Sequence, residues 1–352
     1  MKLHRFLLPG VLLPVSAAAA GRACQSGRYR ITAPNGVQRA GYVPLGGIRQ
    51  YVQVRSWDAA HPVLLVLHGG PGSPMSDWSY GWQAALERAC TVVHWDQRGC
   101  GNTYFQDPGA PRPTLEHLLS DLDELVDLLR ADFGVEKVVL LGHSWGTYLG
   151  ALYAAAHPEK VSAYVGVSQM VDFRTSERVS AREAVRRARA AGRTRDAQTI
   201  LRELEQVLDR RTLDRPGAQA LLRLRQHKER YLPEQYGSRM LRWRLTSPYL
   251  TPSVLRWMVR FDALVTSSQA LYEALLDDHA SLSERCLRFE VPVLLVAGEH
   301  DWTTPHSTAL AYFEALSAPR KKFLTIAGAG HLPFADQPEA FSAALLSFLS
   351  RL

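Results

Sequence analysis

The sequence predicts an α/β fold in which a mainly parallel sheet is covered by helices on both faces. Two observations predict it. Short apolar runs alternate with helix-like segments up to about residue 170, and the same alternation resumes after about residue 290. Between these parts, residues 171–285 read as helices rich in Arg, Glu, Ala and Leu, without a clear strand. We therefore expect one core, made of residues 24–170 and 286–352, with a helical cap inserted at 171–285.

The expected strands are mostly continuous apolar runs, which are typical of strands buried on both faces of a parallel sheet. Parallel strands need long crossovers, and the helical segments between the runs supply them. The first strands of the core are expected to be antiparallel, because the sequence of residues 41–57 indicates a hairpin that turns at Gly46-Gly47. The other strands are expected at 63–67 (VLLVL), 91–95 (TVVHW), 137–142 (KVVLLG), 161–168 (VSAYVGVS), 291–298 (VPVLLVAG) and 321–328 (KKFLTIAG).

The clearest helix is predicted over residues 114–134. Its leucines recur at helical spacing, Thr114 is suited to the N-cap, and Gly134 can end the helix. Further helices of the core are expected at 147–157, 307–317 and 338–352. Each of them follows an expected strand, as a right-handed crossover or a closing helix requires.

The first residues have the layout of a secretory signal peptide. Lys2 and Arg5 precede an apolar stretch, 6–20, that ends in small residues. The stretch is too short to span a bilayer, and Pro9 and Pro14 disfavour a stable helix. This segment is therefore expected to direct export and not to cross a membrane in the mature protein.

We assign residues 1–23 to this signal peptide, with cleavage near Ala20 or Ala23. The protein is then expected to be secreted or periplasmic, with no stable membrane span after signal cleavage. Two alternatives are an uncleaved N-terminal anchor and a lipid on Cys24, although the residues before Cys24 lack the usual aliphatic side chain.

The charge is concentrated in one segment. The 352 residues carry a formal net charge of +7, but residues 171–260 alone hold 21 Lys+Arg against 10 Asp+Glu, a net charge of +11. The rest of the chain is therefore at −4. Nucleic-acid binding is one interpretation of such a patch, but the segment has no aromatic-basic motif. We favour solvated arginine-rich helices and expect no nucleic-acid partner.

The cysteines indicate neither a disulfide framework nor a metal centre. Cys90 and Cys100 flank the expected strand at 91–95, which holds its ends too far apart for a disulfide. There is no C-x-x-C and no cluster of Cys and His with zinc-ligand spacing. We expect no metal and no cofactor, and nothing in the sequence indicates an oligomeric state.

The strongest chemical signal is GHSWG, residues 142–146, a G-x-S-x-G motif between an expected buried strand and a helix. The chain turns so sharply there that a side chain at either glycine would clash, and the serine is held in a strained conformation. Ser144 is thereby exposed at the start of a helix as a candidate nucleophile. Because an unactivated serine is weak, a base and an orienting acid must follow.

The partners are expected later in the chain, in the order acid and then histidine. Asp301 stands in AGEHD and His331 in AGAGH, each directly after one of the last two expected strands. Carboxyl ends of parallel strands meet at one edge of a sheet, so both would approach Ser144. His331 would take and return the proton, and Asp301 would orient the imidazole. Glu299 is the substitute candidate for the acid.

A glycine-rich stretch, HGGPGSP at 68–74, follows the strand expected at 63–67. A phosphate cradle is disfavoured, because the stretch has neither the Lys-Ser/Thr ending of a P-loop nor G-x-G-x-x-G. Acyl transfer needs fixed N–H donors for a tetrahedral oxyanion. Trp145 supplies one donor and the glycine-rich loop the other. Pro71 has no N–H, and we favour Gly70 at the apex over Gly69.

Together these motifs resemble a known family. HGGPGSP, HWDQRGCGNT (94–103), GHSWGT, GEHD and GAGH are similar to the proline iminopeptidase branch of the α/β-hydrolase superfamily, over about residues 40–170 and 290–350. The resemblance implies an α/β-hydrolase fold, a triad of Ser144, Asp301 and His331, and an oxyanion hole of Gly70 and Trp145. It also implies a helical cap over the site, with DQRG as a structural support of the oxyanion loop.

The chain departs from the family pattern at two places. Family aminopeptidases usually read G-G-S-W-G-S, whereas His143 and Thr147 replace the second glycine and the last serine here. Their caps hold the substrate amine with glutamates near a Trp-Glu motif, which is not found in this sequence. The cap glutamates, none of which matches that pattern, include Glu203, Glu205, Glu229 and Glu234.

The sequence therefore predicts an exported serine hydrolase that cleaves N-terminal residues, possibly proline, from short peptides through an acyl-enzyme. An esterase or amidase on small acyl substrates would use the same site, and an acyltransferase shares the acyl-enzyme. Dehalogenase and epoxide hydrolase chemistry is disfavoured, because those relatives carry Asp at the position of Ser144. A non-catalytic binding protein is disfavoured by the complete set of serine, acid and histidine.

Overall fold

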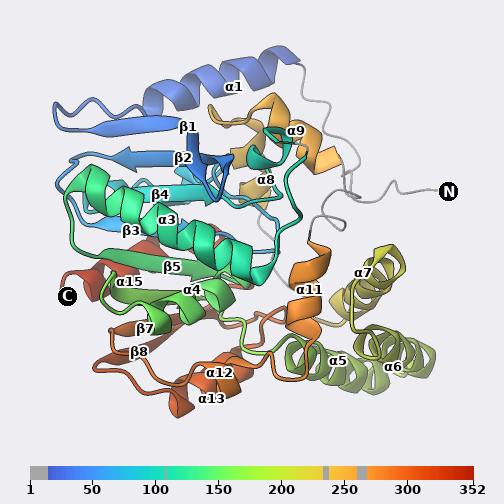
Figure 1. The fold of residues 1–352 in the computed structure, drawn as a ribbon. Helices are drawn as coiled ribbons and strands as arrows, with labels where there is room; N and C mark the ends of the chain where they lie inside the picture. The colour runs from blue at the N-terminus through green and yellow to red at the C-terminus, as the bar shows by residue number, and fades with distance from the viewer. Residues whose placement is uncertain (1–14, 108, 233–237, 260–267) are drawn as a thin grey trace.

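The computed structural model describes residues 15–107, 109–232, 238–259 and 268–352. Its centre is an eight-stranded sheet in the order β1-β2-β4-β3-β5-β6-β7-β8 (Figure 1). The pairs β1–β2 and β2–β4 are antiparallel, and the other neighbouring strands are parallel. The strands are β1 (Val37–Leu45), β2 (Ile48–Ser56), β3 (Val63–Leu67), β4 (Thr91–Asp96), β5 (Val138–His143), β6 (Val161–Val167), β7 (Val293–Gly298) and β8 (Lys321–Ile326).

The predicted strands are confirmed, with one difference at the start. The hairpin turns at Gly46 and Gly47, which have φ values of 53° and 75°, but β1 begins at Val37 and not near residue 41. Its first residues, Gln38 to Ala40, are exposed, so no apolar run announces them in the sequence. They belong to the sheet because they pair with β2.

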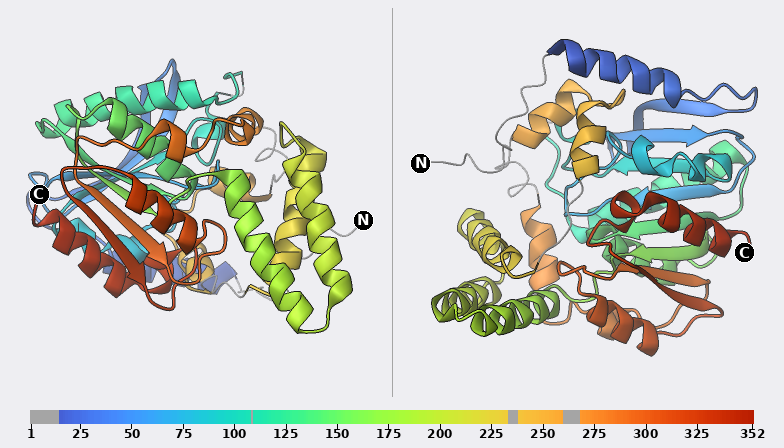
Figure 2. Two further views of the ribbon diagram at one scale, coloured as in Figure 1. Left: turned by 90° about the horizontal axis from the view of Figure 1, so that it is seen from below. Right: turned by 180° about the vertical axis from the view of Figure 1, so that it is seen from behind.

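Two hydrophobic clusters sandwich the sheet, because successive residues of a buried strand point to opposite faces. Leu65 and Leu140 pack with helices α3 and α4, whereas Leu64 and Leu141 pack with α2, α14 and α15 on the other face (Figures 1 and 2). The core helices are α2 (Tyr80–Gln83), α3 (Leu115–Phe133), α4 (Trp145–Ala156), α13 (His306–Ala315), α14 (Pro333–Asp336) and α15 (Pro338–Leu349), with short 3-10 turns η1 (Leu86–Arg88) and η2 (Thr103–Phe105).

The helix predicted over 114–134 is confirmed in its ends as well as its extent. The Thr114 hydroxyl accepts a hydrogen bond from the backbone N–H of His117 at 3.2 Å, which satisfies one of the free donors of the first turn. Gly134 adopts the left-handed conformation, with φ 63°, that ends many helices. The helix therefore lies between two local signals that the sequence already carries.

Between β6 and β7, the described residues form helices joined by turns, with no named strand among them. Helices α5, α6 and α7 pack on one another in sequence and stand apart from the sheet (Figure 2, left). Helix α11 connects this group to the core by contacting both α3 and α5. The inserted helices are α5 (Phe173–Ala190), α6 (Thr194–Leu208), α7 (Arg215–Glu229), α8 (Ser238–Leu245), α9 (Pro252–Val259), α11 (Gln269–Leu276) and α12 (Leu282–Arg285).

Helix α8 belongs to a different place from α5–α7. Its Trp243 ring stacks on Trp78 at 6.5 Å between ring centres, and its Arg244 forms an ion pair with buried Asp77 at 2.6 Å. The backbone carbonyl of Trp243 accepts a hydrogen bond from the Tyr80 hydroxyl at 2.8 Å. The insertion is therefore divided between an outlying helical group and a helix packed on the chain that follows the HGGPGSP loop.

At the N-terminus, helix α1 (Val15–Arg28) runs continuously through both expected cleavage points, Ala20 and Ala23. The first 14 residues of the expected signal peptide lie outside the described residues. Among the helices that the structure describes, none is long and apolar enough to cross a bilayer. All four cysteines are free thiols, with Cys24 exposed and the others buried.

Candidate active site

Ser144 occupies a sharp turn between β5 and α4. Its backbone has φ 52° and ψ −119°, a conformation that residues with a side chain rarely adopt. The flanking glycines are required by space. A Cβ on Gly142 would come within 2.4 Å of the Gly146 carbonyl oxygen, and one on Gly146 would come within 2.1 Å of the Leu67 carbonyl oxygen. The turn places the serine hydroxyl at the sheet edge, as the motif predicts.

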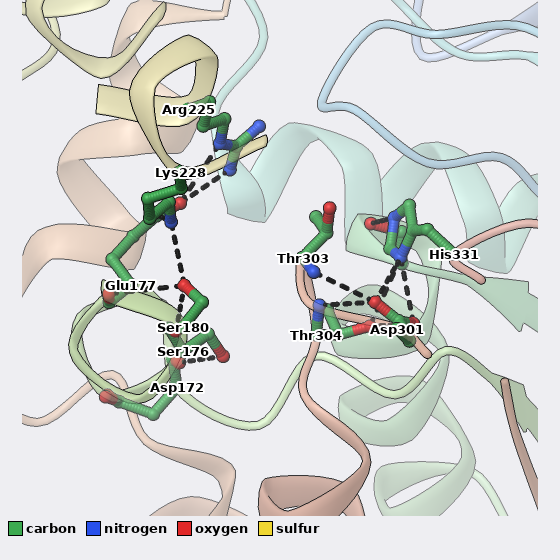
Figure 3. Close-up of polar contacts among 11 residues, drawn as sticks. Asp172, Ser176, Glu177, Ser180, Arg225, Lys228, Asp301, Thr303, Thr304 and His331 are labelled. Carbon is green, nitrogen blue, oxygen red and sulfur yellow. Dashed lines mark hydrogen bonds and ion pairs between the residues drawn. The ribbon is translucent and has the colours of Figure 1, made fainter. Parts of the chain in front are cut away.

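The structure brings the three predicted catalytic residues into one hydrogen-bonded chain. The Oγ atom of Ser144 lies 3.0 Å from Nε2 of His331. Nδ1 of the same ring lies 3.0 and 3.1 Å from the two carboxylate oxygens of Asp301 (Figure 3). All three side chains are largely buried. The arrangement allows proton transfer from the serine to the imidazole while the carboxylate holds the other ring nitrogen.

The carboxylate of Asp301 is held by the residues that follow it. It accepts hydrogen bonds from the backbone N–H groups of Thr303 (3.0 Å) and Thr304 (2.9 Å), and from the Thr304 hydroxyl (2.8 Å; Figure 3). Burial opposes its charge, but the charge of His331 and these hydrogen bonds lower the pKa of Asp301 below its usual value. Asp301 is therefore ionised at neutral pH.

The alternative acid, Glu299, bonds to the backbone of Gly328 and not to His331. Its side chain is exposed, and its Oε2 atom accepts a hydrogen bond from the backbone N–H of Gly328 at 2.9 Å. This bond ties the turn after β7 to the turn after β8. The geometry thus assigns Asp301, not Glu299, to the histidine.

The glycine-rich loop lies directly against Ser144. A Cβ on Gly69 would approach the Cβ of Ser144 to 3.1 Å, and one on Gly70, which has φ 118°, would lie 2.5 Å from the Gly72 nitrogen. Gly70 is required by its positive φ and by the backbone of its own loop, and a side chain at Gly69 would be tight against the nucleophile. Trp145 is the first residue of α4, so its N–H has no partner within the helix and lies at the positive end of the helix dipole.

The DQRG segment packs against the glycine-rich loop and the start of α4, as the resemblance implies. Gln97 donates its backbone N–H to the His68 ring at 3.2 Å, and its side-chain oxygen accepts from the Trp145 indole at 3.3 Å. Arg98 forms a buried ion pair with Asp121 at 2.7 Å and also donates to the Gly46 carbonyl. Burial lowers the pKa of His68 to about 4, so the ring is neutral and can accept the hydrogen bond from Gln97.

The structure adds residues that the sequence analysis missed. The carbonyl oxygen of His331 accepts hydrogen bonds from Nε2 of His143 at 2.9 Å and from Oγ of Ser168 at 3.0 Å. The bonds from the backbone of Thr303 and Thr304 could have been suspected, because an Asp side chain in a turn commonly accepts a hydrogen bond from the backbone two residues on. Ser168 has no such local signal, since its partner lies 163 residues away.

A second buried carboxylate, Glu177, lies between helices α5 and α7 of the insertion, and its partners are cations and not a histidine. Glu177 accepts hydrogen bonds from Lys228 and from Arg225 at 2.8 Å, and Lys228 also donates to the Ser180 hydroxyl at 2.7 Å (Figure 3). Although burial alone would raise it, these two cations lower the pKa of Glu177 to about 2. The group is a buried ion cluster that joins two helices of the insertion.

The cap glutamates singled out from the sequence have separate places. Glu203 is buried and bonded to the His227 ring at 2.6 Å, whereas Glu205 and Glu229 are exposed. Glu234 lies outside the described residues. Within the part of the chain that the structure describes, no group of three or more His, Cys, Asp or Glu side chains has the arrangement of a metal site.

The fold and this geometry define the class of the protein. The family model for the alpha/beta hydrolase fold matches residues 62–338, most of the chain, and the chain belongs to that family. This agrees with the mainly parallel eight-stranded sheet. Within the family, the chain is similar to proteins named aminopeptidase and proline iminopeptidase.

Two relatives show this similarity in sequence, and one solved structure shows it in fold. The chain is 27% identical to "Probable aminopeptidase YbaC" of Bacillus subtilis, over 86% of this chain and 93% of that protein. It is 25% identical to a "Proline iminopeptidase" of Heyndrickxia coagulans, over 89% and 99% of the two chains. The crystal structure of a proline iminopeptidase-related protein from Thermus thermophilus shares the fold, with a TM-score of 0.54, 24% identity and coverage of 89% and 98%.

Proposed function

We propose that this hydrolase is a serine hydrolase that acts through an acyl-enzyme, with Ser144 as nucleophile, His331 as general base and acid, and Asp301 as the orienting carboxylate. One observation carries the proposal: the Oγ–Nε2 distance of 3.0 Å continues into the Nδ1–carboxylate contact at 3.0 Å. The serine sits at the strained turn that presents its hydroxyl to a substrate. No cofactor is part of the proposed reaction.

The steps follow from the positions of these atoms. Oγ of Ser144 attacks the substrate carbonyl carbon while Nε2 of His331 takes its proton, and the carbonyl oxygen becomes an oxyanion. The backbone N–H groups of Gly70 and Trp145 hold that oxyanion. Collapse breaks the bond to the leaving group, which receives the proton from His331. Water then attacks the acyl-enzyme with the same histidine as base, and this releases the acid product and restores Ser144.

For the substrate, we propose the N-terminal residue of a short peptide, possibly proline, as the acyl group. This is supported by the relatives named aminopeptidase and proline iminopeptidase, which align over most of both chains. The leaving group would be the amine of the second residue. The inserted helical segment at 171–285 would act as a cap that limits the length of the peptide on the acyl side.

One observation favours a second candidate, an esterase or amidase on small acyl substrates. An aminopeptidase must balance the positive charge of the substrate amine, and a carboxylate is the usual partner. The two buried glutamates of α5 and α6, Glu177 and Glu203, already have cationic or imidazole partners. A substrate without a free amine would need no further carboxylate.

A first experiment tests the serine mechanism. The purified protein is treated with a fluorophosphonate probe, beside a Ser144→Ala variant and a buried-serine control, Ser342→Ala in α15. We expect labelling of the wild type and of the control, and loss of both labelling and hydrolysis by roughly a million-fold for Ser144→Ala. Labelling that survives in the Ser144→Ala variant would refute the assignment.

A second experiment separates the two substrate classes. Proline 4-nitroanilide, its N-acetylated form and 4-nitrophenyl acetate are compared with the same enzyme preparation. Aminopeptidase activity predicts turnover of the first compound and at least a hundred-fold loss on N-acetylation, because the amine is then uncharged. Turnover of the ester without turnover of the free prolyl anilide would overturn the aminopeptidase proposal and favour the esterase.

We also propose that the protein is exported by cleavage of residues 1–23. The basic start and apolar stretch of the sequence support this. The test is N-terminal sequencing of the protein recovered from the periplasm or medium of a bacterial host. We expect a mature chain that begins near Gly21 or Cys24; an intact N-terminus on membrane-bound protein would instead favour the uncleaved anchor.

A further inference from the structure

Two serines of the described chain share an uncommon backbone conformation. Ser144 and Ser168 are the non-glycine residues with positive φ, at 52° and 53°, in the residues that the structure describes. They follow the neighbouring parallel strands β5 and β6. Both bond to the same residue, since Ser144 contacts the ring of His331 and Ser168 contacts its carbonyl oxygen. Backbone strain at such positions persists where the side chain makes an interaction that glycine could not make.

Ser168 is fixed on both sides. It is fully buried, its backbone N–H donates to the Val296 carbonyl at 2.8 Å, and its hydroxyl donates to the His331 carbonyl at 3.0 Å. The first bond extends the parallel pairing of β6 and β7. The second leaves the sheet and reaches the turn between β8 and α14. A glycine would relieve the φ strain but would remove this second bond.

His143 supplies a second donor to the same oxygen. Its Nε2 atom lies 2.9 Å from the His331 carbonyl, and the two rings lie 5.0 Å apart. Burial, and then the charge of His331, lower the pKa of His143 to about 3, so the ring is neutral at neutral pH. Because a carbonyl can only accept, Nε2 must carry the proton. The Nδ1 side of the ring faces Gly69, where a Cβ would lie 3.0 Å away.

We propose that Ser168 and His143 are positioning residues that fix the main chain of His331 and so keep its ring between Asp301 and Ser144. The inference rests on the proposed function of His331. That residue lies in a turn, after β8 ends at Ile326 and before α14 begins at Pro333, so no helix or strand orients it. Donors from the ends of β5 and β6 connect the turn to the rigid edge that carries the nucleophile.

The structure offers a matched pair of variants. Ser168→Ala and Ser168→Gly both remove the hydroxyl, but only the glycine also removes the φ strain. If Ser168 serves stability alone, activity follows stability, and the glycine variant keeps wild-type rates. If it positions His331, both variants lose activity to the same extent, while the glycine variant has the higher unfolding midpoint, Tm.

The measurement is the rate of fluorophosphonate labelling against probe concentration, which separates the maximal rate from the half-saturating concentration. We expect each Ser168 variant to lower the maximal rate on the order of 10-fold, with the half-saturating concentration unchanged, because the reacting groups move while the binding surface does not. Ser342→Ala serves as the buried-serine control. Tm is measured for every variant in the same buffer.

Variants of His143 test the proposal independently. His143→Gln keeps an amide donor near the position of Nε2 and should retain most of the rate, whereas His143→Leu removes the donor and should resemble Ser168→Ala. Wild-type labelling by Ser168→Gly, or equal rates for His143→Leu and His143→Gln, would overturn the proposal. Failure of the proposed function looks different, because the wild type itself would then not be labelled at Ser144.

Discussion

Two buried carboxylates, Asp301 at the sheet edge and Glu177 in the inserted helices, show how one chemical group takes two roles. Both have a lowered pKa, and both lie in networks of hydrogen bonds. Asp301 contacts a histidine, which can gain and lose a proton near neutral pH. Glu177 instead forms ion pairs with a lysine and an arginine. The partner therefore decides whether a buried carboxylate supports proton transfer or helix packing.

Of the two carboxylates, Asp301 should give the larger effect on the reaction when it is changed. Asp301→Asn keeps the size of the side chain but gives the imidazole of His331 a hydrogen-bond donor in place of an acceptor. Nδ1 of the ring would then accept from the amide, so Nε2 would carry the proton and could not take one from Ser144. We therefore expect kcat to fall by about 10,000-fold. Assay of the purified variant, with circular dichroism as the check on folding, measures this. A fall of less than ten-fold would contradict the proposed role.

The second prediction concerns the ion cluster of Glu177. Lys228→Met leaves the buried carboxylate with Arg225 as its remaining cationic partner, so the cost should lie below the about 3–5 kcal/mol of a buried charge that loses all compensation. We expect a lower urea midpoint but an unchanged maximal labelling rate for the protein that is still folded. Lys322→Met, an exposed lysine on β8, is the control. A loss of labelling in the folded Lys228 variant would give the cluster a role in the reaction.

The smallest effect is a difference in pH dependence between the two regions. Burial lowers the pKa of His94 in the core to about 3 from 6.5, so its contribution to stability is present above pH 6.5 and is lost as the pH falls toward 3. The pKa of Glu177 is lowered to about 2 from 4.5, so its contribution is lost only as the pH falls below 4.5. Acid should therefore weaken the histidine-containing core first.

Urea midpoints between pH 7.5 and pH 3 measure this difference in the wild type, His94→Gln and Glu177→Gln. We expect His94→Gln to flatten the wild-type curve between about pH 6.5 and 4, and Glu177→Gln to flatten it below about pH 4.5. The glutamine can still bond to Gln83, which lies 2.6 Å from the His94 ring. A Glu177→Gln curve that departs in shape from the wild type above pH 5.5 would contradict the assignment.

Much of the fold and of the candidate site follows from the sequence, because the signals are local. Thr114 and Gly134 mark the ends of α3 by their own backbone preferences, and GHSWG specifies its turn through two glycines that a side chain would make impossible. The start of β1 was not predicted, because exposed residues pair there without an apolar pattern. The division of the insertion between α5–α7 and α8 was also missed, since long-range contacts of Trp243 and Arg244 create it.

By itself, the sequence determined the α/β class, the alternation that gives a parallel sheet, and a candidate set of Ser144, His331 and an acid, Asp301 with Glu299 as the substitute. These depend on side-chain spacing and on turns a few residues long. Only the tertiary structure decided that Asp301 and not Glu299 meets His331, and that Ser168 and His143 hold the histidine main chain. Those contacts join residues far apart in the chain, so their geometry exists only after the strands have assembled into the sheet.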